Sequence, residues 1–265
     1  MNKTPFFSVI TASFNSEKTI YKTLASLLNQ TYTGFEYIII DGNSNDSTLE
    51  IIKSFEGKFK EKNIVYKFIS ESDKGIYDAW NKGINLSAGE WISFVGSDDY
   101  YLPESLTIYD KAIKSLKADI NYISSKIIII DEKENELNTI GEKFVWKNFL
   151  KKMDIAQVGS FHKKELFEQI GTFSTNYKIV GDLDFYLRAK DVIKPSFLNL
   201  VTGKMMNNGV SNQINKALKE ALIVRLKYGY QSRTNIYFNH FLSLIRCHGS
   251  RIKQKGVFIK LLLKI

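Results

Sequence analysis

The chain has 265 residues, of which 44% are hydrophobic and 13% aromatic, so it can build a full core and global disorder is excluded. Its formal net charge of +9 favours phosphorylated substrates, other polyanions or an anionic membrane surface, with ordinary solubility charge as the alternative. The single cysteine, Cys247, excludes an internal disulfide and a cysteine zinc cluster and fits a reducing compartment.

The first hundred residues predict alternating strands and helices. Short apolar runs closed by turn residues predict strands at 6–10, 36–40, 65–69 and 91–95, with residues 11–15 as a loop. Helices are expected after a Ser16 cap, after residues 45–47, and where Ile76, Trp80 and Ile84 recur at helical spacing. This alternation predicts a parallel sheet with helices on both faces, and Trp80 is expected in the core.

The second half of the chain predicts a more mixed structure. A helix is expected after Pro103, a strand at 121–130 with a turn at 131–135, and helical structure from about Asn215. The fold class expected is therefore α/β, with a mixed second half and a helical C-terminal segment. We expect one domain over residues 1–212, with halves 1–100 and 101–212, followed by a basic helical extension over 213–265.

Three of the expected strands end in acidic residues: Asp41, Asp73, and the pair Asp98 and Asp99. Ligands of open α/β sheets bind outside the carboxyl ends of the strands, so these carboxylates should share one crevice. Two adjacent carboxylates repel unless a cation or hydrogen-bond donors hold them together, and a hard divalent ion carrying substrate phosphates is the economical explanation. The loop 11–15 has no glycine-rich turn, which argues against an NAD site and a P-loop.

Four segments together resemble the family 2 glycosyltransferases, whose fold is called GT-A. They are FSVITASFN at 7–15 with IIDGNSNDST at 39–48, SDKGIYDAWNKG at 72–83, SDD at 97–99, and GDLDFYLR at 181–188. The second of these is similar to a subgroup found in bacterial surface-polysaccharide biosynthesis, such as that of O-antigen, capsule or colanic-acid-like glycans. The resemblance implies a Rossmann-like nucleotide-sugar-binding half over 1–100 and an acceptor and catalytic half over 101–212.

The resemblance also implies roles for individual residues. Asp182 would be the catalytic base of an inverting transfer, and Asp99, with Asp98, would bind Mn²⁺ or Mg²⁺. The donor-binding residues implied are Thr11, Ala12, Asn15, Asp41, Asp73, Lys74, Ser97 and Asp98. The chain departs from the family pattern at Gly96, where relatives often have a further acid, and at Gly181, where many have Glu.

Each of the main acidic residues also has a purely structural interpretation. Asp41 would cap a turn with Ser44, Asp73 would fix an Asp-Lys-Gly turn, and Asp182 would be an acid at a helix N-terminus. The same holds for Lys74, which either meets the diphosphate or is solvated. His162 is expected to be a satisfied or surface histidine.

The resemblance further implies the reaction partners. The donor expected is a nucleotide-diphosphate sugar, UDP most often, and the group moved is a hexosyl or N-acetylhexosaminyl unit. The acceptor expected is a saccharide linked to polyprenyl diphosphate, for which Trp146 and Tyr177 are candidate stacking residues. A non-catalytic nucleotide-sugar-binding protein and a sugar-phosphate nucleotidyltransferase are the alternatives.

The sequence also indicates where the protein works. No signal-peptide pattern opens the chain and no apolar run is long enough to span a bilayer, which predicts a cytoplasmic protein. The segment 251–265 mixes apolar and basic residues without acid, which predicts peripheral contact with the anionic inner face of the membrane, or a helix packed on its own domain. No nucleic-acid-binding motif is present, so a nucleic-acid partner is not expected.

Overall fold

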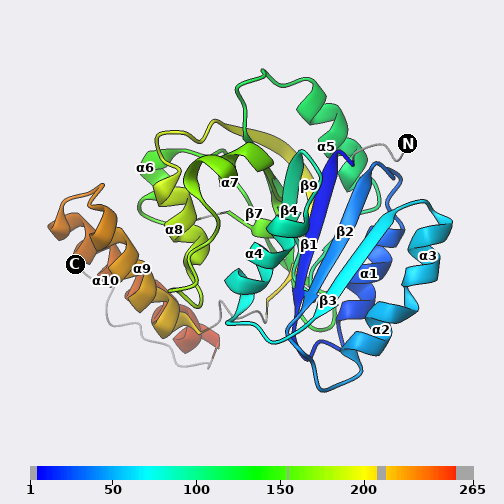
Figure 1. Ribbon diagram of the computed structural model, residues 1–265. Helices are drawn as coiled ribbons and strands as arrows, with labels where there is room; N and C mark the ends of the chain where they lie inside the picture. Colours follow the sequence, from blue (N-terminus) through cyan, green and yellow to red (C-terminus); the bar gives the residue numbers. More distant parts are fainter. Residues whose placement is uncertain (1–4, 154, 208–212, 255–265) are drawn as a thin grey trace.

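The protein folds around one mixed β-sheet with helices on both faces (Figure 1). The structure is a computed structural model and describes residues 5–153, 155–207 and 213–254. The strands are β1 Phe7–Ser13, β2 Phe35–Asp41, β3 Val65–Ser70, β4 Trp91–Phe94, β5 Tyr100–Tyr101, β6 Tyr122–Ile130, β7 Glu136–Ile140, β8 Ser160–Lys163 and β9 Pro195–Met206. The helices are α1 Ile20–Leu28, α2 Thr48–Ser54, α3 Glu56–Glu61, α4 Ile76–Leu86, α5 Ser105–Lys114, α6 Trp146–Phe149, the 3₁₀ turn η1 Gln157–Gly159, α7 Lys164–Ile170, α8 Gly181–Arg188, α9 Ile214–Tyr228 and α10 Arg233–Gln254.

The strand order separates the sheet into a parallel half and a mixed half. The order is β3-β2-β1-β4-β8-β6-β9-β5, with β7 paired to β6. Strands β3, β2, β1 and β4 are parallel, whereas β8 runs antiparallel to both β4 and β6. The α/β class predicted from the sequence, with its mixed second half, is confirmed.

Alternate residues of the central strand β1 build two cores, one on each face of the sheet. Val9 packs with Leu24 of α1, whereas Ile10 packs with Trp80 of α4, and all three aliphatic side chains are fully buried. Trp80 is also buried, as predicted. Helix α4 approaches β1 closely at Gly83, where an added Cβ would lie 2.4 Å from the Ile10 Cγ2 atom.

Two expected boundaries at the start of the chain are wrong. Strand β1 does not stop at residue 10 but continues to Ser13, because Thr11 and Ser13 keep pairing with β2 and their hydroxyls find buried partners. Helix α1 begins at Ile20, because the Ser16 carbonyl accepts the N–H groups of Thr19 and Ile20 in a preceding turn. The Ser16 hydroxyl therefore does not cap the helix.

The helical C-terminal segment begins at α9, close to the predicted position. Ala221 and Val224 of α9 are buried in the same core as Trp80, so α9 packs directly on the sheet domain. Gly229 ends the helix with φ 63°, a left-handed conformation that glycine adopts without strain. Within the described residues, no helix is both long and apolar enough to cross a membrane. The basic segment 251–265 lies outside the residues whose side chains the structure describes.

Candidate active site

The loops that follow the parallel strands are tied together at their carboxyl ends, where the sequence predicts a crevice (Figure 1). The Asn15 side-chain oxygen accepts the Asn45 N–H at 2.9 Å, and the Asn15 N–H donates to Ser44 Oγ at 2.8 Å. The hydroxyls of Ser16 and Ser97 lie 2.8 Å apart and join the loop after β1 to the loop after β4. Asn15 and Ser97 thus lie at the rim of the predicted site, where they shape its loops.

Thr11 and Ala12 lie inside the sheet rather than in a loop. The Thr11 side chain is fully buried and its hydroxyl accepts a hydrogen bond from Tyr37 at 3.0 Å. Ala12 is half-buried and packs against the core beneath α4. Thr11 can therefore shape a donor site only through the position of β1, because its side chain is not accessible to a ligand.

Asp41, at the end of β2, has a carboxylate with four internal hydrogen bonds. Its Oδ1 accepts from Ser44 Oγ at 2.5 Å and Ser13 Oγ at 3.2 Å, and its Oδ2 accepts from Ser70 Oγ at 2.7 Å and the Ser44 N–H at 3.0 Å. A carboxylate offers about four acceptor positions, so all of them are engaged. A nucleobase N–H can reach Asp41 only where one serine hydroxyl turns away.

Asp73 lies where the loops after β1, β2 and β3 meet. Its Oδ1 accepts the Gly75 N–H at 2.7 Å, as an Asp-Lys-Gly turn requires, while its Oδ2 reaches across to the next loop. A Cβ added at Gly42 would lie 2.8 Å from this Oδ2 and 3.3 Å from the Phe14 ring. Phe14 is 59% exposed although aromatic, and its place in a polar loop is the signal that could have identified it from sequence.

The acidic pair after β4 converges on Gly96. A Cβ added at Gly96 would lie 2.8 Å from Asp99 Oδ2 and 2.9 Å from Asp98 Oδ1, so the two carboxylates fill the space that a further acid would need. Asp99 Oδ1 accepts the Met206 N–H at 3.0 Å, which ties the pair to β9. Burial, with the charge of Asp98 adding to it, raises the pKa of Asp99 to about 8, and burial also raises the pKa of Asp98.

This arrangement fits a divalent cation. An oxygen of the buried Asp99 and one of the half-buried Asp98 face the same point, and this proximity of two carboxylates is costly unless a positive ion joins them. In the described part of the chain, no group of three or more His, Cys, Asp and Glu side chains is placed to hold a metal. Asp98 and Asp99 would therefore hold an ion whose remaining ligands come from phosphate and water oxygens, as Mg²⁺ sites commonly do.

Asp182 lies in the first turn of α8, and its carboxylate is half-buried. Its Oδ1 accepts the Leu183 N–H at 2.8 Å and lies 3.2 Å from the Tyr77 hydroxyl, which also donates to the Ile179 carbonyl at 2.7 Å. Burial raises the pKa of Asp182 above its ordinary value. Gly181 is required beside it, because a Cβ there would lie 2.8 Å from the Tyr77 ring. The Tyr77 ring therefore leaves no space for a side chain at this position.

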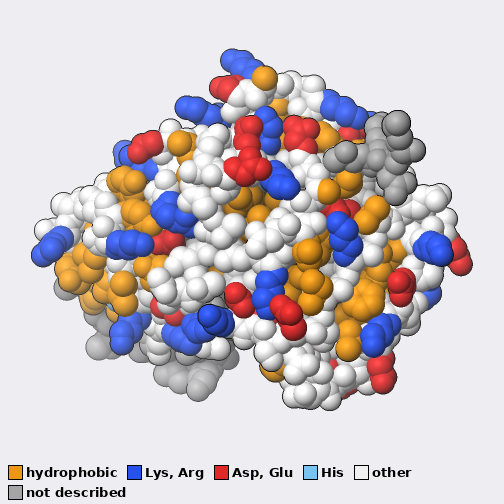
Figure 2. Space-filling view, viewed as in Figure 1, with side chains coloured by type: hydrophobic (Ala, Val, Ile, Leu, Met, Phe, Trp, Pro, Cys, Tyr) orange, Lys and Arg blue, Asp and Glu red, His pale blue; other side chains and the backbone are white. Residues whose placement is uncertain are grey.

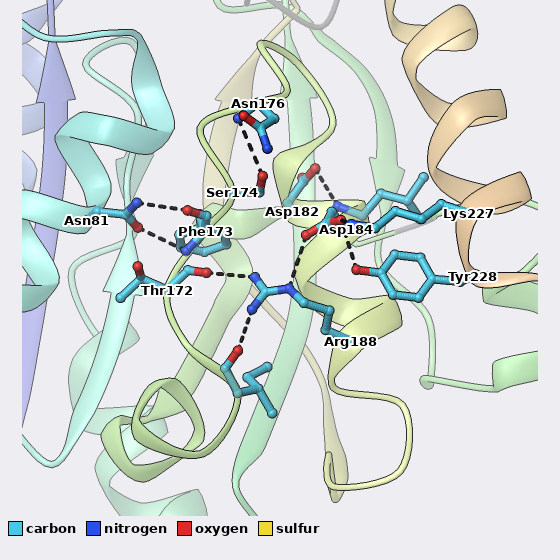
Figure 3. Close-up of polar contacts among 12 residues, drawn as sticks. Asn81, Thr172, Phe173, Ser174, Asn176, Asp182, Asp184, Arg188, Lys227 and Tyr228 are labelled. Carbon is cyan, nitrogen blue, oxygen red and sulfur yellow. Dashed lines mark hydrogen bonds and ion pairs between the residues drawn. The ribbon is translucent and has the colours of Figure 1, made fainter.

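The segment before α8 is fastened to α4 and to the loop that follows β3. The Asn81 side chain of α4 donates to the Phe173 carbonyl at 2.8 Å and accepts its N–H at 2.9 Å (Figure 3). The Lys178 ammonium donates to the Lys74 carbonyl at 2.5 Å. Lys74 is thus joined to the segment carrying Asp182 through its backbone, while its side chain is exposed.

The second acid of the segment, Asp184, has a different set of partners from Asp182. It is 1% exposed and accepts hydrogen bonds from Lys227 Nζ at 3.1 Å and Tyr228 Oη at 2.9 Å, while Arg188 Nε donates to its other oxygen at 3.1 Å (Figure 3). The role of Asp184 in holding α9 was missed, because its partners lie more than 40 residues away in the sequence.

The remaining residues considered in the sequence analysis, His162, Trp146 and Tyr177, contact other side chains of the protein. His162 is fully buried and its Nε2 lies 3.0 Å from the Tyr186 hydroxyl, so the prediction of a satisfied histidine is confirmed for that nitrogen. Burial lowers its pKa to about 3. Trp146 packs edge-on against Phe149, and Tyr177 is half-buried with the Lys227 ammonium 5.9 Å from its ring centre.

A parallel sheet with an acidic pair after β4 and a half-buried acid on a later helix agrees with the glycosyltransferase family that the sequence motifs resemble, and comparison with known proteins identifies the same family. Residues 8–178 match the family described as "Glycosyl transferase family 2", so the chain belongs to that family. A "PGL/p-HBAD biosynthesis glycosyltransferase" of Mycobacterium tuberculosis is 28% identical over 214 residues, covering 79% of this chain and 80% of that protein. A chondroitin synthase of Escherichia coli is 24% identical over 82% of this chain but only 31% of its own length.

Solved structures share the fold at low sequence identity. S. aureus TarS 1–349 in complex with UDP-GlcNAc superposes with a TM-score of 0.64 at 20% identity, covering 97% of this chain and 76% of TarS 1–349. The mannosyltransferase PcManGT from Pyrobaculum calidifontis, in complex with GDP-Man and Mn²⁺, superposes with a TM-score of 0.61 at 14% identity, covering 96% of this chain and 80% of its own. The GT-A fold expected from the sequence is therefore confirmed.

Proposed function

We propose that this protein is an inverting glycosyltransferase that moves a hexosyl or N-acetylhexosaminyl unit from a UDP-sugar to a saccharide acceptor in bacterial surface-polysaccharide biosynthesis. The observation that carries the proposal is Asp182, an acid of raised pKa on an element fastened to the loops at the strand ends. The family and the UDP and UDP-GlcNAc complexes of TarS support a nucleotide-sugar donor.

The donor is proposed to bind across the carboxyl ends of β1 to β4. Phe14 offers an exposed ring on which a base can stack, and Asp73 lies next to it with one oxygen free of turn hydrogen bonds. Asp41 and Asn15 hold the loops around this position, with Ser97 completing the rim. The exposed Lys74 side chain can reach a diphosphate from the same edge.

Asp98 and Asp99 are proposed to hold Mn²⁺ or Mg²⁺, in keeping with the Mn²⁺ in the PcManGT complex. When bound, this ion supplies positive charge that stabilises a nucleotide diphosphate as a leaving group. Because the two acids leave no space for a third at Gly96, an ion bound here would be held by two protein carboxylates.

Asp182 is proposed to be the general base. An acceptor hydroxyl oxygen forms a bond to the anomeric carbon while the bond from that carbon to the diphosphate oxygen breaks, and the hydroxyl proton passes to the Asp182 carboxylate. A raised pKa suits this role, because proton transfer is most effective when the pKa of the base approaches the working pH.

The acceptor is proposed to be linked to polyprenyl diphosphate, so the protein would work at the inner face of the cytoplasmic membrane. Helix α10 exposes Tyr237, Phe238, Phe241 and Ile245 at spacings of one, three and four residues, which places them on one side of the helix. Figure 2 shows hydrophobic side chains together with Lys and Arg over the region of α9 and α10. Such a face suits an anionic lipid surface.

The proposal is tested by thermal unfolding of the full chain with UDP, GDP, dTDP and CMP, each with and without Mn²⁺. A ligand at about a hundredfold over its Kd stabilises the folded state by about 2.7 kcal/mol, so we expect a clear rise in Tm from UDP that requires Mn²⁺. Asp99→Ala should abolish most of this Mn²⁺-dependent rise in Tm, whereas Asp191→Ala, at a carboxylate that is 83% exposed, should leave it unchanged. No shift from any nucleotide would contradict the proposed donor site.

A further inference from the structure

Helix α9 reaches the segment that carries Asp182 through one carboxylate. Glu220 accepts hydrogen bonds from three consecutive backbone N–H groups, those of Lys178 at 3.1 Å, Ile179 at 2.9 Å and Val180 at 3.3 Å. These amides immediately precede the first residue of α8 and lie two to four residues before Asp182. A negative charge at this position is also favoured by the positive end of the α8 dipole.

The same segment is held from the opposite side by α4. The Tyr77 hydroxyl donates to the Ile179 carbonyl at 2.7 Å and lies 3.2 Å from Asp182 Oδ1. Ile179 is therefore fixed through its N–H by α9 and through its carbonyl by α4. These two contacts fix the backbone three residues before Asp182, where no further backbone hydrogen bond of Ile179 is described.

Glu220 can act as a fixed point because α9 itself is firmly docked. Val224, one helical turn further on, is fully buried, and Lys227 and Tyr228 hydrogen bond the buried Asp184 of α8. Glu220, Val224 and Lys227 are spaced by four and three residues, so they share one face of the helix. Glu220 thus meets the segment just before α8, and Lys227 meets α8 itself, while α9 lies beyond the residues 8–178 that match the family.

We propose that α9 is part of the catalytic apparatus and that Glu220 is a positioning residue for Asp182. This inference rests on the proposed function, since it assumes that Asp182 takes the acceptor proton. Without the Glu220 carboxylate, the three backbone N–H groups would hydrogen bond to water instead, and the segment from Lys178 to Asp182 would lose these hydrogen bonds to α9. Because catalysis depends steeply on geometry, a displacement of about 1 Å can cost about a hundredfold in rate.

The kinetic test compares Glu220→Ala with Lys219→Ala, an exposed neighbour on the same helix, in the full chain. Release of UDP from UDP-GlcNAc with water as acceptor is measured in Mn²⁺, with Asp182→Asn as the reference for loss of the base. We expect kcat of Glu220→Ala to fall about tenfold to a hundredfold with KM changed less than twofold, and Lys219→Ala to match the wild type. Glu220→Gln keeps one acceptor oxygen and should lie between them.

The outcomes separate the two proposals. If the wild type releases UDP no faster than Asp182→Asn, the proposed function fails. If the wild type is active and Glu220→Ala has an unchanged kcat, only the role of Glu220 is overturned. A Glu220→Ala protein that loses kcat and donor affinity together would also overturn it, since that result indicates general damage to the fold.

Hydrogen–deuterium exchange gives a readout that does not need activity. The amides of residues 178–180 should exchange at least about tenfold faster in Glu220→Ala than in Lys219→Ala, while those of β1 and β2 stay unchanged. The pH profile adds a second readout: the Asp182 carboxylate is faced by Tyr77 of α4, Gln157 of η1 and Tyr186 of α8, and a looser segment admits water to it. Its pKa then falls, so the acid limb of kcat should move to lower pH; unchanged exchange and an unmoved limb would contradict the role.

Discussion

Asp182 provides the sharpest test at the scale of single residues. Asp182→Asn keeps the size of the side chain and an acceptor for the Leu183 N–H, but it cannot take a proton at neutral pH. We expect donor binding to stay within about twofold and transfer to fall by about 10² to 10⁴, the range that a general base contributes. Isothermal titration with UDP and a transfer assay measure the two quantities, and normal turnover by the variant would show that another group is the base.

His162 should control how stability responds to acid. Burial lowers its pKa to about 3 in the folded protein, against about 6.5 in the unfolded chain, so only the unfolded state gains a proton between these values. The contribution of neutral His162 to the free energy of unfolding is therefore fully present above pH 6.5. It is lost as pH falls toward 3, at up to about 1.4 kcal/mol per pH unit. Urea unfolding of the wild type and His162→Gln from pH 7 to 4.5 should show a shallower loss in the variant; equal slopes would contradict the prediction.

Two glycines test packing at the scale of helices and strands. Gly83 lets α4 approach β1, and a Cβ there meets the fully buried Ile10, whereas Gly57 of α3 has no atom within 4 Å of an added Cβ. We expect Gly83→Ala to lower the free energy of unfolding by about 1 to 3 kcal/mol. Gly57→Ala should raise it by about 0.5 to 1 kcal/mol, because alanine reduces the entropy of the unfolded chain. Denaturant midpoints of both variants measure the difference, and shifts of the same sign would refute the packing argument.

The sequence predicts those strands and helices that a local pattern of apolar and turn residues defines. Apolar runs between turn residues identify the parallel strands, and helical spacing identifies α4 with its buried Trp80. The end of β1 was missed because Thr11 and Ser13 look like loop residues, although their hydroxyls have buried partners on β2. The insertion of β8 between β4 and β6 was also not predicted, because pairing between distant strands leaves no periodic signal.

The same distinction holds for the candidate site. The acidic motif residues follow the strands as expected, whereas Thr11 and Ala12 lie within β1, and the hydrogen bonds of these residues could not be predicted from spacing. Asp41 is engaged by three serines from three segments, and Glu220 meets amides about 40 residues earlier in the chain. The donor-site role of Asp41 is a proposal, and the positioning role of Glu220 is a proposal that the Glu220→Ala variant tests.

At the scale of the whole molecule, the excess of positive over negative charge lies entirely in the C-terminal segment. Residues 221–265 contain nine Lys and Arg and no Asp or Glu, whereas residues 1–220 contain 28 basic and 28 acidic residues. The entire formal net charge of +9 therefore belongs to the segment that includes α10. The exposed face of Tyr237, Phe238, Phe241 and Ile245 lies in this segment, with exposed Arg233 and Arg246 flanking it in sequence. Apolar contact and electrostatic attraction would then act on the same lipid surface, each adding to the affinity.

This combination predicts how the full chain binds vesicles. Binding to phosphatidylglycerol vesicles should exceed binding to phosphatidylcholine vesicles and weaken as salt rises, because surface charges are screened within about 10 Å at 0.1 M salt. Replacing Phe238 and Phe241 by Ser should lower binding about tenfold or more, since each buried phenyl ring contributes about 1.5 to 3 kcal/mol. The matched control replaces Leu137 and Leu200, each 51% exposed but distant in sequence from α10, and should bind like the wild type. If both double variants bind equally, α10 is not the contact; if the α10 variant instead changes the mass measured by light scattering, the face joins two copies of the chain.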